Sequence, residues 1–367
     1  MKKSRIFFLP AFLVIALFLS IVPSCSRIQT VTIGLITDLD GGNSHIGNEI
    51  FQNLKLFQRE TNLFKLNILA LSAPTVVSVP EQFQKLWDQG VRIFVIGHIS
   101  AGIRELIEKK NPQDCLIFNL LSASQTFSGI DDCFIRMVPD TKAESLAIAE
   151  YIEANLHGKK ILVIYETQNY PYTLPALAVL TNTIDNPCSV YGMNLAEFKT
   201  KEIGAALKKF DFDGVYLLIG GDYATQAGLL THIIKGIRPG CKIILSPWLN
   251  TSAYLENSGS SSDGAVVPSL LPSGDTDTPF REFLNTFYRA FNVFPRVPQS
   301  YFAYEAMQIL SGSIQAGKSA PQEIKSYILN SPGFDTILGK LTFDKFGDVH
   351  RVYRFLVIRN GKTVYEN

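Results

Sequence analysis

The stretch VRIFVIGHISAG at residues 91–102 constrains the fold more than any other part of the chain. Its first half, Val91 to Ile96, is an apolar, β-branched run broken only by Arg92, which is typical of a strand buried on both faces of a parallel sheet. Gly97 ends the run, and a turn of small residues leads into the helix-like segment IRELIEKK. Such a turn places free N–H groups and a hydroxyl at the edge of the sheet where α/β folds bind ligands, although any strand-to-helix unit needs a small turn.

Strand-like and helix-like segments alternate on both sides of this stretch. A first series of strands is expected at 30–36, 66–71, 91–96, 116–121 and 134–138, and a second at 160–165, 189–193, 214–219 and 242–245. This alternation predicts an α/β protein with parallel, doubly wound sheets. Because 367 residues exceed what one hydrophobic core usually holds, we expect two domains.

The composition indicates a globular protein and gives no sign of catalysis or of nucleic-acid binding. Hydrophobic residues make up 46% of the chain and charged residues 18%, with a formal net charge of +1 and no basic stripe. The five histidines are scattered without metal-ligand spacing, and the sequence has no phosphate-binding loop, dinucleotide fingerprint or nucleophile elbow. We therefore expect a non-enzyme without cofactor, metal or nucleic-acid partner.

The N-terminus has the features of an export signal. Lys2, Lys3 and Arg5 precede the apolar run 6–22, and the sequence VPSC at 22–25 resembles a bacterial lipobox. This pattern predicts a signal peptide at 1–24 and a lipidated Cys25, so that the exported chain is anchored to a membrane and faces the periplasm or the cell exterior. An uncleaved membrane anchor is the alternative, since the apolar run is near the lower limit of a membrane-spanning helix.

Export makes disulfides possible for the remaining four cysteines. Cys115 and Cys133 each precede an apolar strand-like run, so their side chains would be neighbours if those two strands pair in parallel. We name this pair as a disulfide candidate. Cys188 and Cys241 also begin strand-like runs, but nothing in the sequence places them together.

The order of motifs along the chain resembles that of a known family. Six segments carry the resemblance: IGLITDLDGGNSHIG, VRIFVIGHISAG, FIRMVPDTKAESLAIAEYI, VIYETQNYPY, YFAYEAMQIL and GKLTFDKFGD. They are similar to the type I periplasmic binding proteins, specifically the branched-chain amino acid (Leu/Ile/Val-binding) type of ABC-transporter substrate-binding proteins. The resemblance covers residues 30–367.

This resemblance implies a Venus-flytrap fold of two doubly wound parallel-sheet lobes joined by three crossing strands. The crossings are expected near Pro139, near Val266 to Leu270 and near Ile337 to Leu341. Lobe 1 would contain 25–138 and 268–338, and lobe 2 would contain 139–267 and 339–367. Members of the family hold an α-amino acid between the lobes and deliver it to a membrane permease.

The family's binding positions fall on particular residues of this chain. The carboxylate-binding turns of lobe 1 correspond to Ala101 and to the segment Ser122, Ala123 and Ser124, with Ser100 as a neighbouring hydroxyl donor. The acid of lobe 2 that holds the ammonium group corresponds to Trp248, and Asp222 is the only nearby acid at a strand end that we expect to replace it. Further expected ligand-binding residues are Ser44, His45, Tyr170 and Tyr223. A helix N-cap for Asp222 and a plain loop role for His45 remain open.

Three functions are consistent with these features. The first is a lipid-anchored protein that passes a small polar solute, an amino acid or an analogue, to an ABC permease. The second is a binding module whose closed form signals to a membrane receptor. The third is a degenerate lipoprotein that keeps the fold without capturing a solute, because the amino-acid signature is incomplete at Ala101, Ala123 and Trp248.

Overall fold

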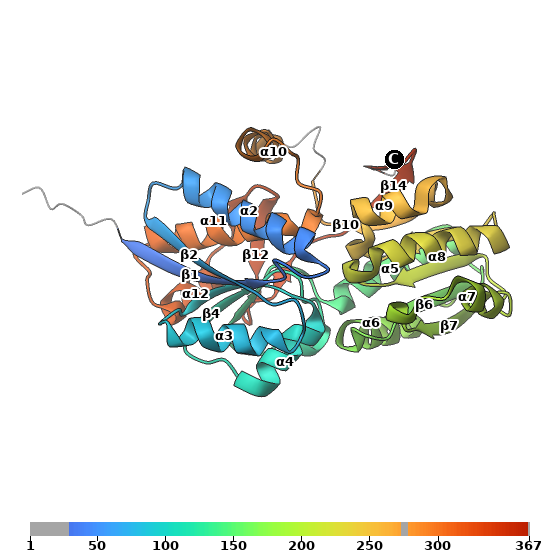
Figure 1. The fold of residues 1–367 in the computed structure, drawn as a ribbon, viewed down its shortest axis with the longest axis horizontal. Helices are drawn as coiled ribbons and strands as arrows, with labels where there is room; N and C mark the ends of the chain where they lie inside the picture. Colours follow the sequence, from blue (N-terminus) through green and yellow to red (C-terminus); the bar gives the residue numbers. More distant parts are fainter. Residues whose placement is uncertain (1–28, 273–277, 366–367) are drawn as a thin grey trace, which may run out of the picture.

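The computed structural model describes residues 29–272 and 278–365, which form two α/β lobes lying side by side (Figure 1). The expected signal peptide and Cys25 fall outside these residues. No helix of the two described ranges is long and apolar enough to cross a membrane. The α/β class is as predicted, with helices on both faces of a mostly parallel sheet in each lobe.

Lobe 1 is built on a five-stranded sheet in which every neighbouring pair is parallel. The central strand comes from the run identified in the sequence, and all five of its residues are buried because helices cover both faces. The strand order is β2 (Lys65–Ser72), β1 (Thr30–Thr37), β3 (Ile93–Gly97), β4 (Leu116–Asn119), β5 (Phe134–Arg136). Its helices are α2 (Ser44–Glu60), α3 (Ser78–Asp88), α4 (Ser100–Lys110), α10 (Thr278–Phe291), α11 (Tyr301–Gln315) and α12 (Pro321–Asn330).

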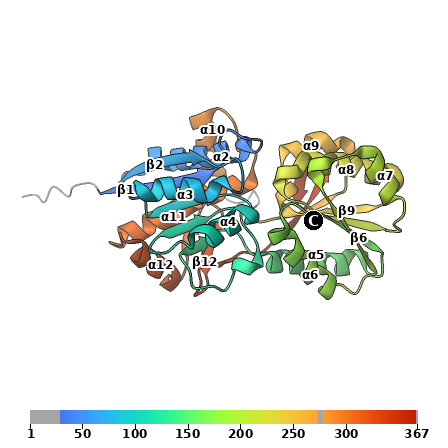
Figure 2. The ribbon, with the colours of Figure 1, turned by 60° about the horizontal axis from the view of Figure 1, so that its bottom comes forward.

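Lobe 2 contains a seven-stranded sheet in which β14 alone runs antiparallel to its two neighbours, β10 and β15, so this sheet is not wholly parallel. The strand order is β15 (Lys362–Tyr365), β14 (Arg354–Arg359), β10 (Val266–Ser269), β9 (Lys242–Leu245), β8 (Gly214–Leu218), β6 (Ile161–Glu166), β7 (Cys188–Met193). The helices are α5 (Thr141–Leu156), α6 (Tyr170–Thr183), α7 (Thr200–Leu207), α8 (Ala224–Ile237) and α9 (Ser252–Ser258); Figure 2 shows them around the lobe 2 sheet.

Two expected lobe boundaries differ from the structure. Strand β10 pairs with β9 at Val266 and with β14 up to Ser269, so lobe 2 extends beyond the predicted boundary at 267. Residues 339–350, which the resemblance assigned to lobe 2, lie with lobe 1. There β12 (Gly339–Phe343) pairs with β11 (Phe334–Thr336) and β13 (Val349–His350), and Gly347 accepts the backbone N–H of Arg136 in β5 at 2.8 Å. The third crossing is therefore at 351–353 and not near Ile337 to Leu341.

A buried ion pair fixes this third crossing to lobe 1. The Nη2 atom of Arg351 lies 2.5 Å from Oε2 of Glu305 in α11, and both side chains are almost fully buried. The same guanidinium donates through Nε to the carbonyl of Met137 in the first crossing, at 3.2 Å. The first and third crossings, which we call the hinge, are therefore connected through Arg351.

Candidate functional site

The carboxyl ends of the parallel strands of both lobes face each other, and the two lobes make direct hydrogen bonds across the cleft. The backbone N–H of Ala101 donates to Oδ1 of Asn169 at 3.1 Å. The side chain of Gln299 donates to the carbonyl of Pro247 at 3.1 Å, and the hydroxyl of Ser124 donates to the carbonyl of Pro171. The cleft is thus closed in this structure.

Two of the cavities between the closed lobes adjoin each other and share Ile46, Ile99, Leu121 and Asp222. The first, which we call the aromatic chamber, has a volume of about 40 Å³ and is also lined by Ser100, Asn169, Tyr172, Gly220, Gly221, Trp248, Thr251, Val297 and Gln299. The second, which we call the acidic chamber, has a volume of about 180 Å³ and is also lined by Thr37, Asp38, Asn43, Gly47, Pro74, Thr75, Val76, Gly97 and His98.

A larger hollow of about 1320 Å³ runs along the crossing segments, with Pro139, Asp140 and Arg351 among its lining residues. It shares no lining residue with either chamber. We therefore place the candidate site in the two chambers, because they lie where strand ends of both lobes converge.

The serines of lobe 1 come together as one hydrogen-bonded group. Ser100 is buried at the N-terminus of α4 and lines the aromatic chamber. Its Oγ accepts the hydroxyl of Ser122 at 3.0 Å and the backbone N–H of Ser124 at 3.2 Å. Ala123 is buried behind them, and its carbonyl accepts the N–H of Thr141 at 2.7 Å. Of this group, Ser100 alone is among the residues that line the chambers.

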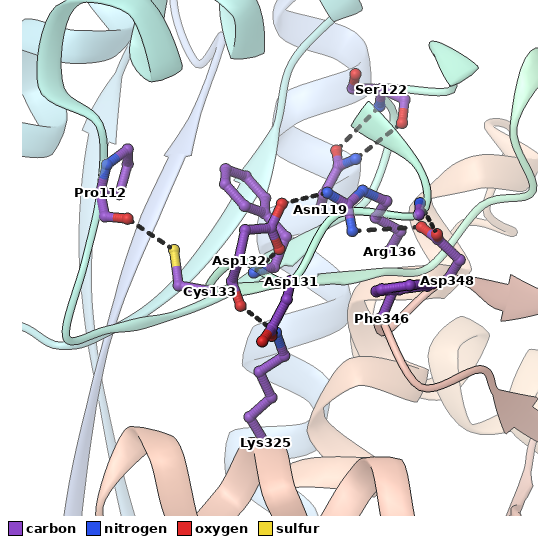
Figure 3. Close-up of polar contacts among 12 residues, drawn as sticks. Pro112, Asn119, Ser122, Asp131, Asp132, Cys133, Arg136, Lys325, Phe346 and Asp348 are labelled. Carbon is purple, nitrogen blue, oxygen red and sulfur yellow. Dashed lines mark hydrogen bonds and ion pairs between the residues drawn. The ribbon is translucent and has the colours of Figure 1, made fainter. Parts of the chain in front are cut away.

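Polar contacts below the serines hold this turn in place (Figure 3). The side-chain amide of Asn119 donates to the carbonyl of Ser122 at 2.8 Å, and its oxygen accepts the N–H of Ser122 at 3.0 Å. On the next strand, the buried guanidinium of Arg136 pairs with Asp132 and, at 3.3 Å, with Asp348. The strand ends that carry the serine turn are thus fixed by side-chain amide and ionic contacts.

The first turn of α2, after the first loop of lobe 1, places Ile46 at the site. Ser44 and His45 open α2, and neither is among the residues that line the chambers; His45 is exposed. Ile46 lines both chambers one residue further along. The loop is held by the carboxylate of Asp38, which accepts the N–H of Gly41 at 2.6 Å and that of Asn43 at 2.8 Å.

The aromatic side chain that reaches the cleft from α6 is Tyr172 and not Tyr170. Tyr170 is 44% exposed, and its ring lies 5.1 Å from the guanidinium of Arg104 outside the chambers. Tyr172 is buried and lines the aromatic chamber. The sequence does contain a signal for it, because Tyr172, Ala176 and Leu180 share the buried face of α6 at helical spacing.

Trp248 lies in the aromatic chamber, with its ring edge-on to Tyr172 at a centroid distance of 6.2 Å. Behind the two rings is the fully buried Glu144, whose Oε1 accepts the hydroxyls of Tyr172 at 2.7 Å and Tyr216 at 3.2 Å. Burial raises the pKa of Glu144 to about 7, and the three aromatic donors around it oppose that rise. The sequence gives no signal for Glu144, because its pattern is that of an ordinary acidic residue in a helix.

Two acidic residues, Asp222 and Glu166, lie at the strand ends of lobe 2, where the sequence predicted one. Asp222 follows β8 and lines both chambers, and its side chain caps no helix, contrary to the N-cap alternative. Burial raises its pKa to about 6, and the negative charge of Asp38 adds to the rise. Glu166 ends β6, and burial raises its pKa to about 7, with the charge of Asp222 contributing. Tyr223 packs against the lobe 2 core and does not line the chambers.

Cys115 and Cys133 lie together in the buried core of lobe 1. Their sulfur atoms are 3.5 Å apart and are present as thiols in this structure. Cys133 also contacts the carbonyl of Pro112 at 3.5 Å (Figure 3). Cys188 and Cys241 belong to lobe 2 and are also free thiols.

Comparisons with known proteins agree with this architecture. No family model matches the chain. The Leu/Ile/Val-binding protein homolog 1 of Brucella abortus is 24% identical over 333 residues, which cover 87% of each chain. A leucine-binding protein of Thermotoga maritima superposes with a TM-score of 0.80 at 15% identity, covering 92% of this chain and 98% of its own.

A third comparison widens the range of solutes among the structural neighbours. A solute-binding protein of an ABC transporter from Rhodopseudomonas palustris, solved with 3,4-dihydroxybenzoic acid, superposes with a TM-score of 0.78 at 14% identity, covering 91% of this chain and 95% of its own. The resemblance seen in the sequence is confirmed by these matches: the chain has the fold of the type I periplasmic binding proteins and is similar in sequence to Leu/Ile/Val-binding proteins.

Proposed function

We propose that the protein captures an amino acid or a related small polar solute outside the cytoplasm and delivers it to the permease of an ABC importer. The observation that carries this proposal is the pair of chambers enclosed by strand ends of both lobes. Only a ligand that contacts both lobes stabilises their closure, because a ligand shifts a conformational equilibrium by its difference in affinity for the two states.

The side chains of the chambers suggest how a solute would be held. Ile46, Ile99 and Leu121 give an apolar wall, and the rings of Tyr172 and Trp248 suit an apolar or planar portion of the solute. Asp222 replaces, in this proposal, the family's acid and accepts an ammonium group. Ser100, Asn169 and Thr251 line the aromatic chamber and would contact the remainder of the solute.

The permease partner and the membrane anchor complete the proposal. The relatives named after Leu, Ile and Val binding support a role in solute import. We propose further that Cys25 carries the lipid and keeps the protein beside the permease, with its lobes outside the cytoplasm. Globomycin treatment of expressing cells tests the lipid, since blocked processing of a lipoprotein leaves the signal peptide attached.

A thermal-shift screen tests solute capture. The exported chain, residues 25–367, is melted with amino acids, their amides, short aliphatic acids and aromatic acids. A solute at 100 times its Kd is expected to raise the free energy of unfolding by about 2.7 kcal/mol. A chain that no solute of these classes stabilises would contradict the proposal and favour a degenerate fold.

A further inference from the structure

We infer that the solute is a cationic amine without a free carboxylate, that its ammonium group binds between Asp38 and Asp222, and that Asn169 occupies the lobe 1 position that a solute carboxylate would otherwise take. This inference rests on the proposed solute-binding function and narrows its substrate class. Three features of the cleft carry it.

The first feature is that the donors expected for a carboxylate are already used within the protein. The backbone N–H of Ala101 donates to Oδ1 of Asn169 at 3.1 Å. The N–H of Ser124 and the hydroxyl of Ser122 both donate to Ser100, and the hydroxyl of Ser124 donates to the carbonyl of Pro171 in lobe 2. A side-chain amide oxygen has the geometry of a carboxylate oxygen as an acceptor. Lobe 2 therefore supplies lobe 1 with the hydrogen-bond acceptors that a solute carboxylate would supply, through the side chain of Asn169 and the carbonyl of Pro171.

The second feature is that Asn169 is a fixed part of lobe 2. It is buried, and its own backbone N–H donates to Oε2 of Glu166 at 2.8 Å. Its carbonyl accepts the N–H of Tyr172 at 2.9 Å and that of Thr173 at 3.1 Å in the first turn of α6. Because the backbone is anchored on both sides, the amide returns to Ala101 each time the lobes close.

The third feature is the charge of the chambers. Asp38 from lobe 1 and Asp222 from lobe 2 both line the acidic chamber, while no Lys or Arg of the described chain lines either chamber. His98 also lines the acidic chamber, but burial lowers its pKa to about 4, so it adds no positive charge near neutral pH. Closing the lobes brings two carboxylates toward each other, and a cation between them offsets that repulsion, whereas a carboxylate would add to it.

A matched ligand series tests the sign of the charge. Isothermal titration calorimetry with residues 25–367 compares 3-methylbutylamine, leucinamide, leucine and 4-methylpentanoate, and then the corresponding phenylalanine-derived compounds. The amine and the amide of at least one series are expected to bind at least tenfold more tightly than the amino acid, and the acid is expected not to bind. Equal or tighter binding of the amino acid or the acid would overturn this inference while upholding solute capture. If none of the eight compounds binds, this inference is contradicted, and the broader thermal-shift screen decides solute capture separately.

Two variants test the named residues. Asp222→Asn is expected to weaken amine binding at least tenfold, whereas Asp211→Asn, at an exposed acid of the same lobe, is expected to leave it unchanged. Asn169→Ala frees the Ala101 N–H, so the affinity for leucine is expected to rise relative to that for leucinamide. Asn67→Ala, at an exposed amide on lobe 1, is the control. An unchanged leucine-to-leucinamide ratio in Asn169→Ala, with an unchanged melting temperature, would contradict the role of Asn169.

Discussion

The side-chain oxygen of Asn169 accepts the backbone N–H of Ala101 at 3.1 Å, and this bond joins the two lobes at the turn where the family binds a carboxylate. Ala101 has no side-chain donor, so its backbone N–H makes this bond, and lobe 2 supplies the acceptor. Closure of this protein is therefore tied to a contact within the chain as well as to a solute.

Removing that contact should open the cleft. A neutral hydrogen bond contributes about 0.5–1.5 kcal/mol, so Asn169→Ala is expected to lower the ratio of closed to open molecules by roughly two- to tenfold. Small-angle X-ray scattering of the solute-free chain measures this as an increase in the radius of gyration. The Asn67→Ala chain should scatter like the unmodified one. A radius of gyration unchanged by Asn169→Ala would show that the contact does not control closure.

Glu144 should make stability depend on pH. Its pKa is raised by burial to about 7 in the fold from about 4.5 when unfolded, so its favourable contribution is complete below pH 4.5 and is lost as the pH rises through 7. The groups that face it are Tyr172, Tyr216, Trp248 and, further away, Asp140. Glu144→Gln should therefore reduce the loss of unfolding free energy between pH 5 and 8 by up to about 3 kcal/mol.

Urea unfolding at a series of pH values measures the effect of Glu144→Gln. Glu150→Gln, at an exposed acid on the same helix, is the control and should keep the pH dependence of the unmodified chain. Glu166 and Asp222 contribute with the same sign, because their pKa values are also raised, so part of the dependence should remain. An identical pH dependence in the Glu144 and Glu150 variants would refute this assignment.

The ion pair at the hinge should be important for stability. Glu305→Gln leaves the guanidinium of Arg351 buried without its counter-charge, and breaking such a pair costs about 3–5 kcal/mol. The control is Glu108→Gln, which removes the exposed partner of Arg104 and should leave the free energy of unfolding nearly unchanged. Denaturant unfolding measures both changes. Similar small losses in the two variants would show that water or a rearranged side chain compensates Arg351.

Cys115 and Cys133 should form a disulfide under oxidising conditions. With sulfur atoms 3.5 Å apart, a thiol–disulfide oxidant such as oxidised glutathione can remove two hydrogen atoms and join them with little backbone movement. Closing this loop is expected to add about 3 kcal/mol to the free energy of unfolding. Mass spectrometry of peptides after refolding with oxidised glutathione identifies the bond, and Cys115→Ser is the control. Finding Cys115 and Cys133 unlinked after this treatment would exclude the bond.

Much of the fold could be predicted because it depends on local patterns. The buried run at Val91 to Ile96 is the central strand region of lobe 1, and the turn at Asn360 and Gly361 joins β14 and β15 with positive φ at both residues, as such hairpins require. The lobe that receives residues 339–350 could not be deduced in this way. The strands of a hairpin pair with each other whichever lobe the hairpin packs against. Only the contacts of Gly347 and Asp348 with Arg136 therefore decide that these residues lie with lobe 1.

The candidate site was less predictable than the fold because it depends on where helices begin and on burial. Tyr170 and Tyr172 are two residues apart in the first turn of α6, so the exact start of this helix decides which of the two rings faces the cleft. Glu144 and Glu166 look like solvent-facing acids in a helix and at a strand end, and only tertiary packing buries them. By contrast, Ser100, Asp222 and Trp248 follow strands directly, and strand ends of a parallel sheet converge, so their presence at the chambers could be expected.

A calorimetric titration of a cavity-filling variant tests the central claim, which is solute capture between the lobes. Ile46→Trp fills the shared wall of the two chambers, whereas Leu63→Trp adds the same ring at an exposed position after α2. With the tightest solute from the screen, the unmodified chain and the Leu63→Trp chain are predicted to bind one molecule each, and the Ile46→Trp chain to lose binding. Undiminished binding by Ile46→Trp would contradict a site between the lobes.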